Sequence, residues 1–173
     1  LIWNLSLMVV GPFFSVYLVV NLGATPTQIG LLAAANSVTN IIGQRLWGRL
    51  NDRRGAAWVM RVTGLLIPAV PLLWTFAPDP WFLIPVEILA GFLWSGYSLA
   101  SFNLLLSLAP PAQRARFSAI YQMAVFSPAV VGPLLGSVAA NGIGIRPLLF
   151  ISTAGRIAAA LLFMFTVRGD QER

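Results

Sequence analysis

The sequence contains no cysteine and no histidine, and its 173 residues include only five carboxylates. These absences exclude disulfide bonds, thiol chemistry, serine-histidine triads and metal sites built from imidazole or thiolate. Lysine is also absent, because all eleven basic residues are arginines. Without lysine there is no glycine-lysine loop to bind nucleotide phosphates, so we expect no direct use of ATP.

Charged residues make up only 9% of the chain, whereas soluble domains carry roughly 25%. Hydrophobic residues account for 58%, and the mean hydropathy is +0.81. A soluble domain of this length would expose too much apolar surface, so the surrounding solvent is expected to be largely lipid. The chain begins at Leu1 inside an apolar run that does not resemble a signal peptide, and we expect a fragment or a processed piece.

Six apolar segments approach the roughly 20 residues that a helix needs to cross about 30 Å of hydrocarbon. In chain order they are Leu1–Val20, Thr27–Trp47, Trp58–Ala77, Trp81–Ala109, Phe117–Ala140 and Pro147–Val167. Thr25 and Gln28 form a capping box before the second segment, with Pro26 at the first helical position. Prolines at 78, 80, 110 and 111 and a turn over residues 141–144 separate later segments.

The arginines predict the topology of these six spans. Nine of the eleven fall on one side, at Arg45, Arg49, Arg53, Arg54, Arg61, Arg114, Arg116, Arg168 and Arg173. By the positive-inside rule this side is cytoplasmic, so we expect both termini in the cytoplasm and the protein in the plasma (inner) membrane. Topology and anionic lipid headgroups then explain the net charge of +6, and no nucleic-acid partner is expected.

The two halves of the chain resemble each other weakly. Residues 11–17 and 91–97 share glycine, aromatic, serine and tyrosine in the same order, 80 positions apart. Three spans per unit is an odd number, so a second copy would enter the membrane from the opposite face. We therefore predict one domain, residues 1–173, built as a 3+3 inverted repeat with units of about 1–77 and 81–168. Chance similarity between apolar segments is the alternative.

The segment between the second and third spans, residues 48–55, reads GRLNDRRG. It resembles the signature cytoplasmic loop of the major facilitator superfamily and matches it at Gly48, Leu50, Asp52, Arg53 and Gly55. Asn51 replaces the usual small residue, and alanines at 56 and 57 stand where bases are expected. The six-span layout with both ends inside extends the resemblance over the whole chain.

This resemblance implies a gating role for residues 48–55. The glycines suit a tight turn, and Asp52 is the only acid near five arginines. In the family, the matching aspartate helps to close the inward side by pairing with bases and a helix N-terminus in the other half of the transporter. A basic topogenic loop is the alternative. The resemblance also implies a second six-helix half, covalent or homodimeric, and we expect this chain to be the C-terminal one.

The resemblance further implies that the first and fourth spans line a solute cavity. In the fourth, Glu87 is followed on the same face by Gly91, Trp94 and Ser98. A carboxylate this deep predicts proton coupling or cation binding, while an interfacial position or a structural ion pair is the alternative.

In the first span, Asn4, Ser15 and Tyr17 are the predicted cavity residues, with packing or interfacial anchoring as the alternative for Tyr17. Gly11-Pro12 is expected to bend this helix.

Three further polar or helix-breaking groups have structural interpretations. Asn36, Asn40 and Gln44 lie one turn apart and are expected to bind helices together. Gly132, Pro133 and Gly136, in a pattern similar to the fifth helix of proton-coupled drug exporters, suit either a rocking surface or a closely packed, kinked helix. Arg156 is expected to pair with Glu87 or with backbone carbonyls.

Together these patterns predict half of a secondary active transporter that moves a small solute by alternating access, driven by a proton or ion gradient. Import and export, including efflux, remain open. A non-transporting membrane scaffold is the alternative. An intramembrane enzyme ranks last because no paired catalytic constellation is present, and we expect no enzyme activity, cofactor or metal.

Overall fold

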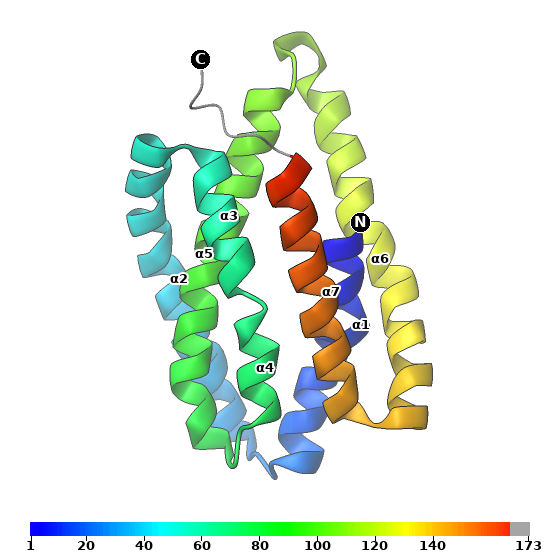
Figure 1. Ribbon diagram of the computed structural model, residues 1–173. Coiled ribbons are helices and arrows are strands. Elements are labelled where there is room, and N and C mark those ends of the chain that lie inside the picture. Colours follow the sequence, from blue (N-terminus) through cyan, green and yellow to red (C-terminus); the bar gives the residue numbers. More distant parts are fainter. Residues whose placement is uncertain (167–173) are drawn as a thin grey trace.

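The structure is a computed structural model that describes residues 1–166, and within this range it is built from helices without strands. The helices are α1 (Ile2–Val16), α2 (Pro26–Arg54), α3 (Ala56–Leu66), α4 (Ala69–Thr75), α5 (Leu83–Leu108), α6 (Arg114–Ile143) and α7 (Ile145–Thr166). Figure 1 shows them as one upright bundle. The all-α membrane fold predicted from the sequence is confirmed. The predicted span end at Val167 and the arginines at 168 and 173 lie outside the described residues.

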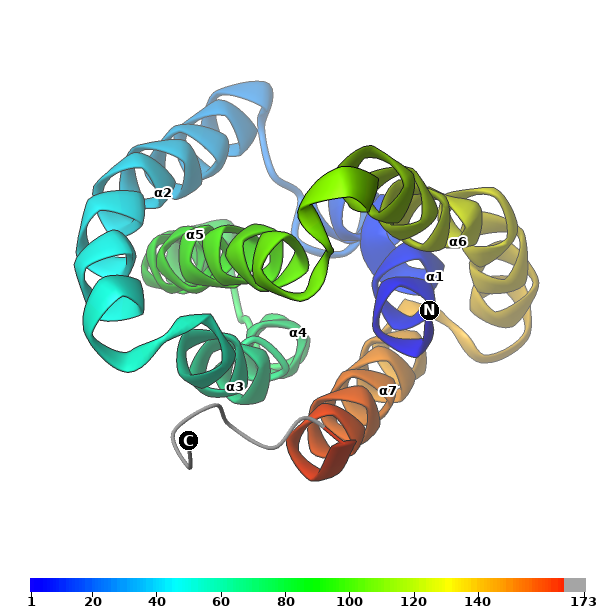
Figure 2. The same ribbon diagram turned by 90° about the horizontal axis from the view of Figure 1, so that it is seen from above.

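Five helical segments of the described chain are long and apolar enough to cross a membrane. They are Ile2–Asn21, Ala56–Thr75, Pro80–Leu108, Pro111–Ile143 and Ile145–Thr166. The sixth predicted span lies in α2, which has 29 residues but is not in this set. Its asparagines and glutamines lower its hydropathy. Because α2 runs alongside α5 for much of its length (Figures 1 and 2), its packing supports a sixth crossing.

The connections between helices alternate between the two ends of the bundle. The α2–α3 and α5–α6 junctions and the end of α7 lie at the same end in Figure 1. The arginines of the first two junctions therefore gather there, whereas Arg146, at the start of α7, lies at the opposite end. This is the distribution that the positive-inside rule uses to orient a membrane protein.

The start of α2 follows the predicted capping box. The Gln28 backbone N–H donates to Thr25 Oγ1 at 3.3 Å, and Gln28 Oε1 accepts from the Thr25 backbone N–H at 2.9 Å. Two backbone donors at the helix start are thereby satisfied, and Pro26 occupies a position where no donor is needed.

The segment 48–55 is not the loop that the sequence suggested. Helix α2 continues through Arg54, so only Gly55 departs from helical geometry, with φ 82° and ψ 156°. Gly48 lies inside the helix, and the expected turn-forming role is right only for Gly55. The physical reason is that one residue with positive φ is enough to end α2 and begin α3 at Ala56.

The third predicted span is broken into α3 and α4. Pro68 and Pro71 lack the N–H groups that would bond to the carbonyls of Gly64 and Ile67 in a continuous helix. The Val70 N–H instead bonds to the Ile67 carbonyl at 3.0 Å, which tightens the chain across the break. The third predicted span is confirmed as a segment long and apolar enough to cross a membrane, Ala56–Thr75, and its two helices follow one path through the bundle (Figure 1).

Two other predicted helix ends shift in the structure. Helix α6 runs to Ile143 and ends at Gly144, with φ 85°, so the turn predicted at 141–144 is shorter than expected. Helix α1 contains Pro12 and continues into a π-helical turn, Tyr17–Asn21, which widens its last hydrogen-bonded ring.

The helices form two groups, and each group combines the first helix of one predicted repeat with later helices of the other. Helix α1 packs against α6 and α7, and α5 packs against α2 and α3. Figure 2 shows the two groups side by side when the bundle is seen from above. The first helix of each predicted repeat thus contacts the later helices of the other. Such an exchange is compatible with a 3+3 repeat, which stays a prediction.

Glycines allow the closest of these contacts. A Cβ on Gly132 would lie 2.5 Å from the Met8 Cβ, and a Cβ on Gly136 would overlap the Val9 carbonyl. Both glycines are buried, and Pro133 lies between them. They face α1 of the same bundle, which agrees with the closely packed helix of the two alternatives above. Small residues are common at such contacts because the hydrophobic effect does not drive helices together in lipid. Association depends instead on close packing of the backbones, which small side chains allow.

We predict that Gly136→Ala lowers the apparent melting temperature of the purified protein in detergent. The added methyl group must push α6 away from the Val9 carbonyl, and overpacking of this kind costs roughly 1–3 kcal/mol. Gly30→Ala in α2 is the matched control, because a Cβ there meets no atom within 4 Å. Equal melting temperatures for the two variants would contradict close packing at Gly136.

Candidate functional site

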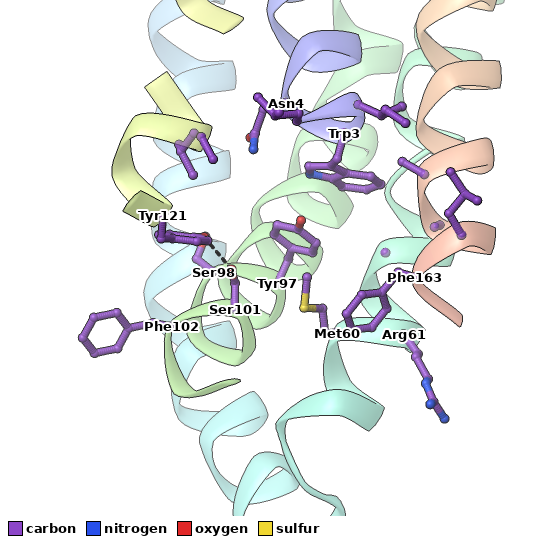
Figure 3. A pocket seen from close by; sticks show the side chains of 18 of the residues that line it. Trp3, Asn4, Met60, Arg61, Tyr97, Ser98, Ser101, Phe102, Tyr121 and Phe163 are labelled. Carbon is purple, nitrogen blue, oxygen red and sulfur yellow. Dashed lines mark hydrogen bonds between the residues drawn. The ribbon is translucent and has the colours of Figure 1, made fainter. Parts of the chain in front are cut away.

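A cavity of about 680 Å³ lies inside the bundle, in the half nearer its arginine-rich end. Five helices form its wall: the start of α1, the middle of α3, the second half of α5, the first half of α6 and the second half of α7. Figure 3 shows the side chains that surround it. The space exists where the two helix groups of the bundle meet.

Three aromatic rings form one side of the cavity. Trp3 of α1 stacks on Tyr97 of α5, with ring centroids 4.9 Å apart and an interplanar angle of 20°. Trp94 lies edge-on to Tyr97 at 5.7 Å and tilted to Trp3 at 6.4 Å. These are the geometries that aromatic quadrupoles favour. The rings join the first and fourth spans across the cavity wall.

Polar groups are few among the residues that line the cavity. Ser101 of α5 and Tyr121 of α6 share a hydrogen bond of 2.5 Å, drawn as a dashed line in Figure 3. Ser98 is exposed and Asn4 is half-buried, and both line the same space. The cavity therefore offers hydroxyl and amide groups beside its aromatic rings.

The structure brings together half of the predicted cavity residues. Asn4, Trp94 and Ser98 all line this cavity, whereas Glu87, Ser15 and Tyr17 do not. Ser15 is exposed near the end of α1, whereas the cavity is lined by the start of this helix. Sequence reasoning missed Tyr97, although it closes the glycine-to-tyrosine pattern that the two halves share, and it missed Trp3, whose position near the chain start gave no signal.

Glu87 lies between three helices and accepts hydrogen bonds with both carboxylate oxygens. Asn36 Nδ2 of α2 donates to Oε2 at 2.7 Å, and Trp74 Nε1 of α4 donates to Oε1 at 3.2 Å. The buried Gly91, one turn further along α5, is pressed against the Asn36 backbone rather than facing the cavity. Glu87 thus braces α5 against α2 and α4 through two neutral donors.

Arg156 of α7 does not pair with Glu87, so this one of its two predicted partners is wrong. Its side chain is only 3% exposed, and within residues 1–166 its Nε has no hydrogen-bond partner. The physical reason is position, because Glu87 lies near the start of α5 between α2 and α4, whereas Arg156 lies in the middle of α7. Nearby, α7 is held to α1 by Ser152, whose Oγ donates to the Ser6 carbonyl at 2.6 Å.

Tyr17 is fully buried at the other end of α1. Its ring packs near Trp74, with centroids 6.4 Å apart, and its hydroxyl accepts a hydrogen bond from Arg146 Nε at 3.3 Å. These contacts match the packing alternative that the sequence left open for Tyr17. They also account for Arg146, the one arginine at this end of the described bundle.

The predicted gating residues lie at the end of α2. Leu50 packs against the core, whereas Asp52, Arg53 and the neighbouring Arg54 are exposed. The Arg54 guanidinium lies 5.4 Å from the centre of the Trp58 ring, which is a cation–π distance. Because gating would involve the other half of a transporter, this role stays a prediction.

The polar ladder of α2 divides between two functions. Asn36 binds α5 through Glu87, as expected of an interhelical contact. Gln44 instead donates to Asn40 Oδ1 of its own helix at 3.2 Å. In the part of the chain that the structure covers, no group of three or more acidic, histidine or cysteine side chains could hold a metal ion.

Comparison with known proteins gives the family. The sequence model of the Major Facilitator Superfamily matches residues 2–173. The "Multi-drug resistance efflux pump PmrA homolog" of Lactococcus lactis is 28% identical over 170 residues, which cover 96% of this chain and 42% of the relative. The "Staphyloferrin B transporter" of Staphylococcus aureus is 29% identical over 148 residues, 83% of this chain and 35% of the relative.

A third relative, "Multidrug resistance protein MdtG" of Proteus mirabilis, is 27% identical over 139 residues, covering 80% of this chain and 34% of its own length. The chain therefore spans less than half the length of the relatives it matches. The match of the family model is nevertheless continuous from the first helix to the last residue. The chain belongs to the major facilitator superfamily.

Proposed function

We propose that this chain is one six-helix half of a secondary active transporter that moves a small solute by alternating access. The observation that carries the proposal is the cavity where α1 and α5 meet, lined by Asn4, Trp94 and Ser98, in a chain that matches the transporter family throughout. Export is the proposed direction, because one relative is named as an efflux pump. Alternating access would open this space to one side of the membrane at a time.

A second half is the proposed protein partner. Helix α6 faces α1 through its glycines, while its opposite side exposes large apolar residues such as Val130 and Val138, the latter 76% exposed. Lipid or another bundle must cover such a surface. The relatives are more than twice as long as this chain, which favours a covalent second half over a homodimer.

The proposed orientation places the α2–α3 junction and both termini in the cytoplasm, in the plasma (inner) membrane. The arginines at one end of the bundle support this orientation. In it, the end of α2, with Asp52 and Arg53, lies on the inward side and is available to a second half as a gate.

Glu87 is the proposed coupling residue. Of the acids within residues 1–166, Asp52 ends α2 and Asp79 caps a turn, so Glu87 is the one that lies inside an apolar span. A proton on Oε2 would turn the acceptor of Asn36 Nδ2 into a donor. Proton uptake would therefore break or reverse the contact between α5 and α2, which couples protonation to helix packing.

A membrane scaffold is the second candidate function. It is favoured by the same Glu87 contacts, because both carboxylate oxygens already have structural partners. The two candidates differ in whether the cavity of α1 and α5 is reached by water and solute.

We predict that Glu87→Gln abolishes pH-gradient dependence of transport. The amide keeps the size of the side chain but cannot exchange a proton, so flux should fall to the passive level, a loss of at least about tenfold, or roughly 1.4 kcal/mol in the barrier. The measurement is uptake of a panel of small labelled solutes into proteoliposomes that contain the complete reading frame. Asp79→Asn removes another carboxylate, at a turn cap, and should keep the gradient dependence. An unchanged pH dependence in Glu87→Gln would remove the coupling role.

Cysteine labelling separates a transporter from a scaffold, because the chain has no native cysteine. We predict that Asn4→Cys and Ser98→Cys react with a membrane-impermeant thiol reagent in a transporter, and that Val138→Cys, on the apolar surface, does not. Labelling is followed by mass shift in native membranes. Protection of both cavity positions would favour the scaffold.

A further inference from the structure

We propose that the cavity is a binding site for flat, ring-bearing molecules that are neutral or anionic, and that it discriminates against lipophilic cations. The inference deepens the proposed function, since it names the class of solute, and it rests on that function only in treating the bound molecule as cargo. Binding at this site can be measured without any transport.

The shape of the site follows from its aromatic wall. Trp3 and Tyr97 lie nearly parallel, and Trp94 stands across them. Tyr121 and Phe163 approach the same space from α6 and α7, as Figure 3 shows. Aromatic rings prefer offset-stacked or edge-to-face neighbours at centroid distances of about 4.5–7 Å. A planar ring system can meet both geometries in this space, whereas a branched polar solute can meet neither.

The polar atoms left unsatisfied near the cavity are donors. Trp3 belongs to the wall, and its Nε1–H is buried without a partner within residues 1–166. Arg156 lies four residues, about one helical turn, before Ala160 of the wall. Its Nε–H is also buried without a partner within residues 1–166. A buried donor without a partner destabilises the folded state. A ligand that carries an acceptor oxygen would be favoured beside them.

The charge beside the cavity comes from Arg156. Among the described residues that line the cavity there is no carboxylate. The Arg156 guanidinium, which stays charged in proteins, is only 3% exposed and lies about one helical turn before Ala160 of the wall. Glu87 is bound to α2 and α4 and is not part of the wall.

This electrostatic arrangement decides between ligand classes. Ring faces attract cations through the quadrupole of the ring. However, a cation here would lose its hydration in an apolar space whose described lining residues include no carboxylate, and it would be repelled by the buried Arg156. The positive charge of Arg156 would stabilise a bound anion, and it would change the affinity of a neutral ring little. The geometry therefore favours anionic and neutral rings.

Gly64 of α3 offers a way to fill the cavity without disturbing its frame. It is buried and lines the space, yet a Cβ built on it meets no atom within 4 Å. The side chain of Gly64→Leu should thus occupy the ligand's volume. Gly30→Leu in α2 is the matched control, because it adds the same group at an exposed helical position that is equally open.

The test uses the complete reading frame, purified in nanodiscs, and three ligands with one ring system: 2-naphthoate, 2-naphthol and 2-naphthylmethylammonium. Binding is followed by quenching of tryptophan fluorescence and by calorimetry. We expect the anion and the neutral ring to bind at least about tenfold more tightly than the cation, which corresponds to roughly 1.4 kcal/mol. Gly64→Leu should weaken naphthoate binding by a similar factor, and Gly30→Leu should leave it unchanged.

Arg156 variants test the origin of the preference. Arg156→Gln should bring naphthoate affinity down to that of naphthol, while Arg156→Lys should preserve the difference. Equal or tighter binding of the cation, or equal binding by the Gly64→Leu and Gly30→Leu proteins, would overturn the inference. Either result would leave gradient-driven transport standing. Conversely, selective naphthoate binding by a protein that moves no solute would reject transport and keep the site.

Discussion

The close backbone contacts of α1 and α5 with their neighbours determine the rest of this structure. In hydrocarbon, apolar side chains gain little by leaving lipid for another helix, so association depends on how closely backbones approach. Gly136 meets the Val9 backbone where α6 crosses α1, and Gly91 meets the Asn36 backbone where α5 crosses α2. The first contact holds α1 in the group with α6 and α7, and the second holds α5 in the group with α2 and α3. The cavity lies where these two groups meet.

The polar groups of the bundle obey the same constraint. Glu87 is satisfied by Asn36 and Trp74, and Tyr17 by Arg146, so these groups contribute contacts between helices rather than a surface for a solute. Around the cavity the opposite holds, because Trp3 and Arg156 keep donors without partners within residues 1–166. Buried donors are costly unless something completes them. This difference places the binding chemistry at the aromatic end of α5 and the structural chemistry at its start.

Much of the fold was predictable from local physical signals. The Thr25 cap and the prolines at 110–111 place helix ends correctly, because a capping box and a missing N–H act within one turn. Residues 48–55 misled the prediction, since leucine, asparagine and arginine all tolerate a helix and only Gly55 needs another geometry. The break between α3 and α4 was signalled by Pro68 and Pro71, but hydropathy alone joins the two pieces.

The candidate site was predictable only in part, for a different reason. Helical spacing put Glu87, Trp94 and Ser98 on one face, but that face spans two environments once α2 and α4 cover its first turn. Which neighbour covers a residue depends on tertiary packing, so neither the Asn36 contact nor the Trp3–Tyr97 stack could be read from spacing.

An experimental structure of the complete transporter with bound 2-naphthoate tests the central claim most directly. The account predicts the ring in the cavity, against Trp3 and Tyr97. A ligand bound outside this cavity would contradict it.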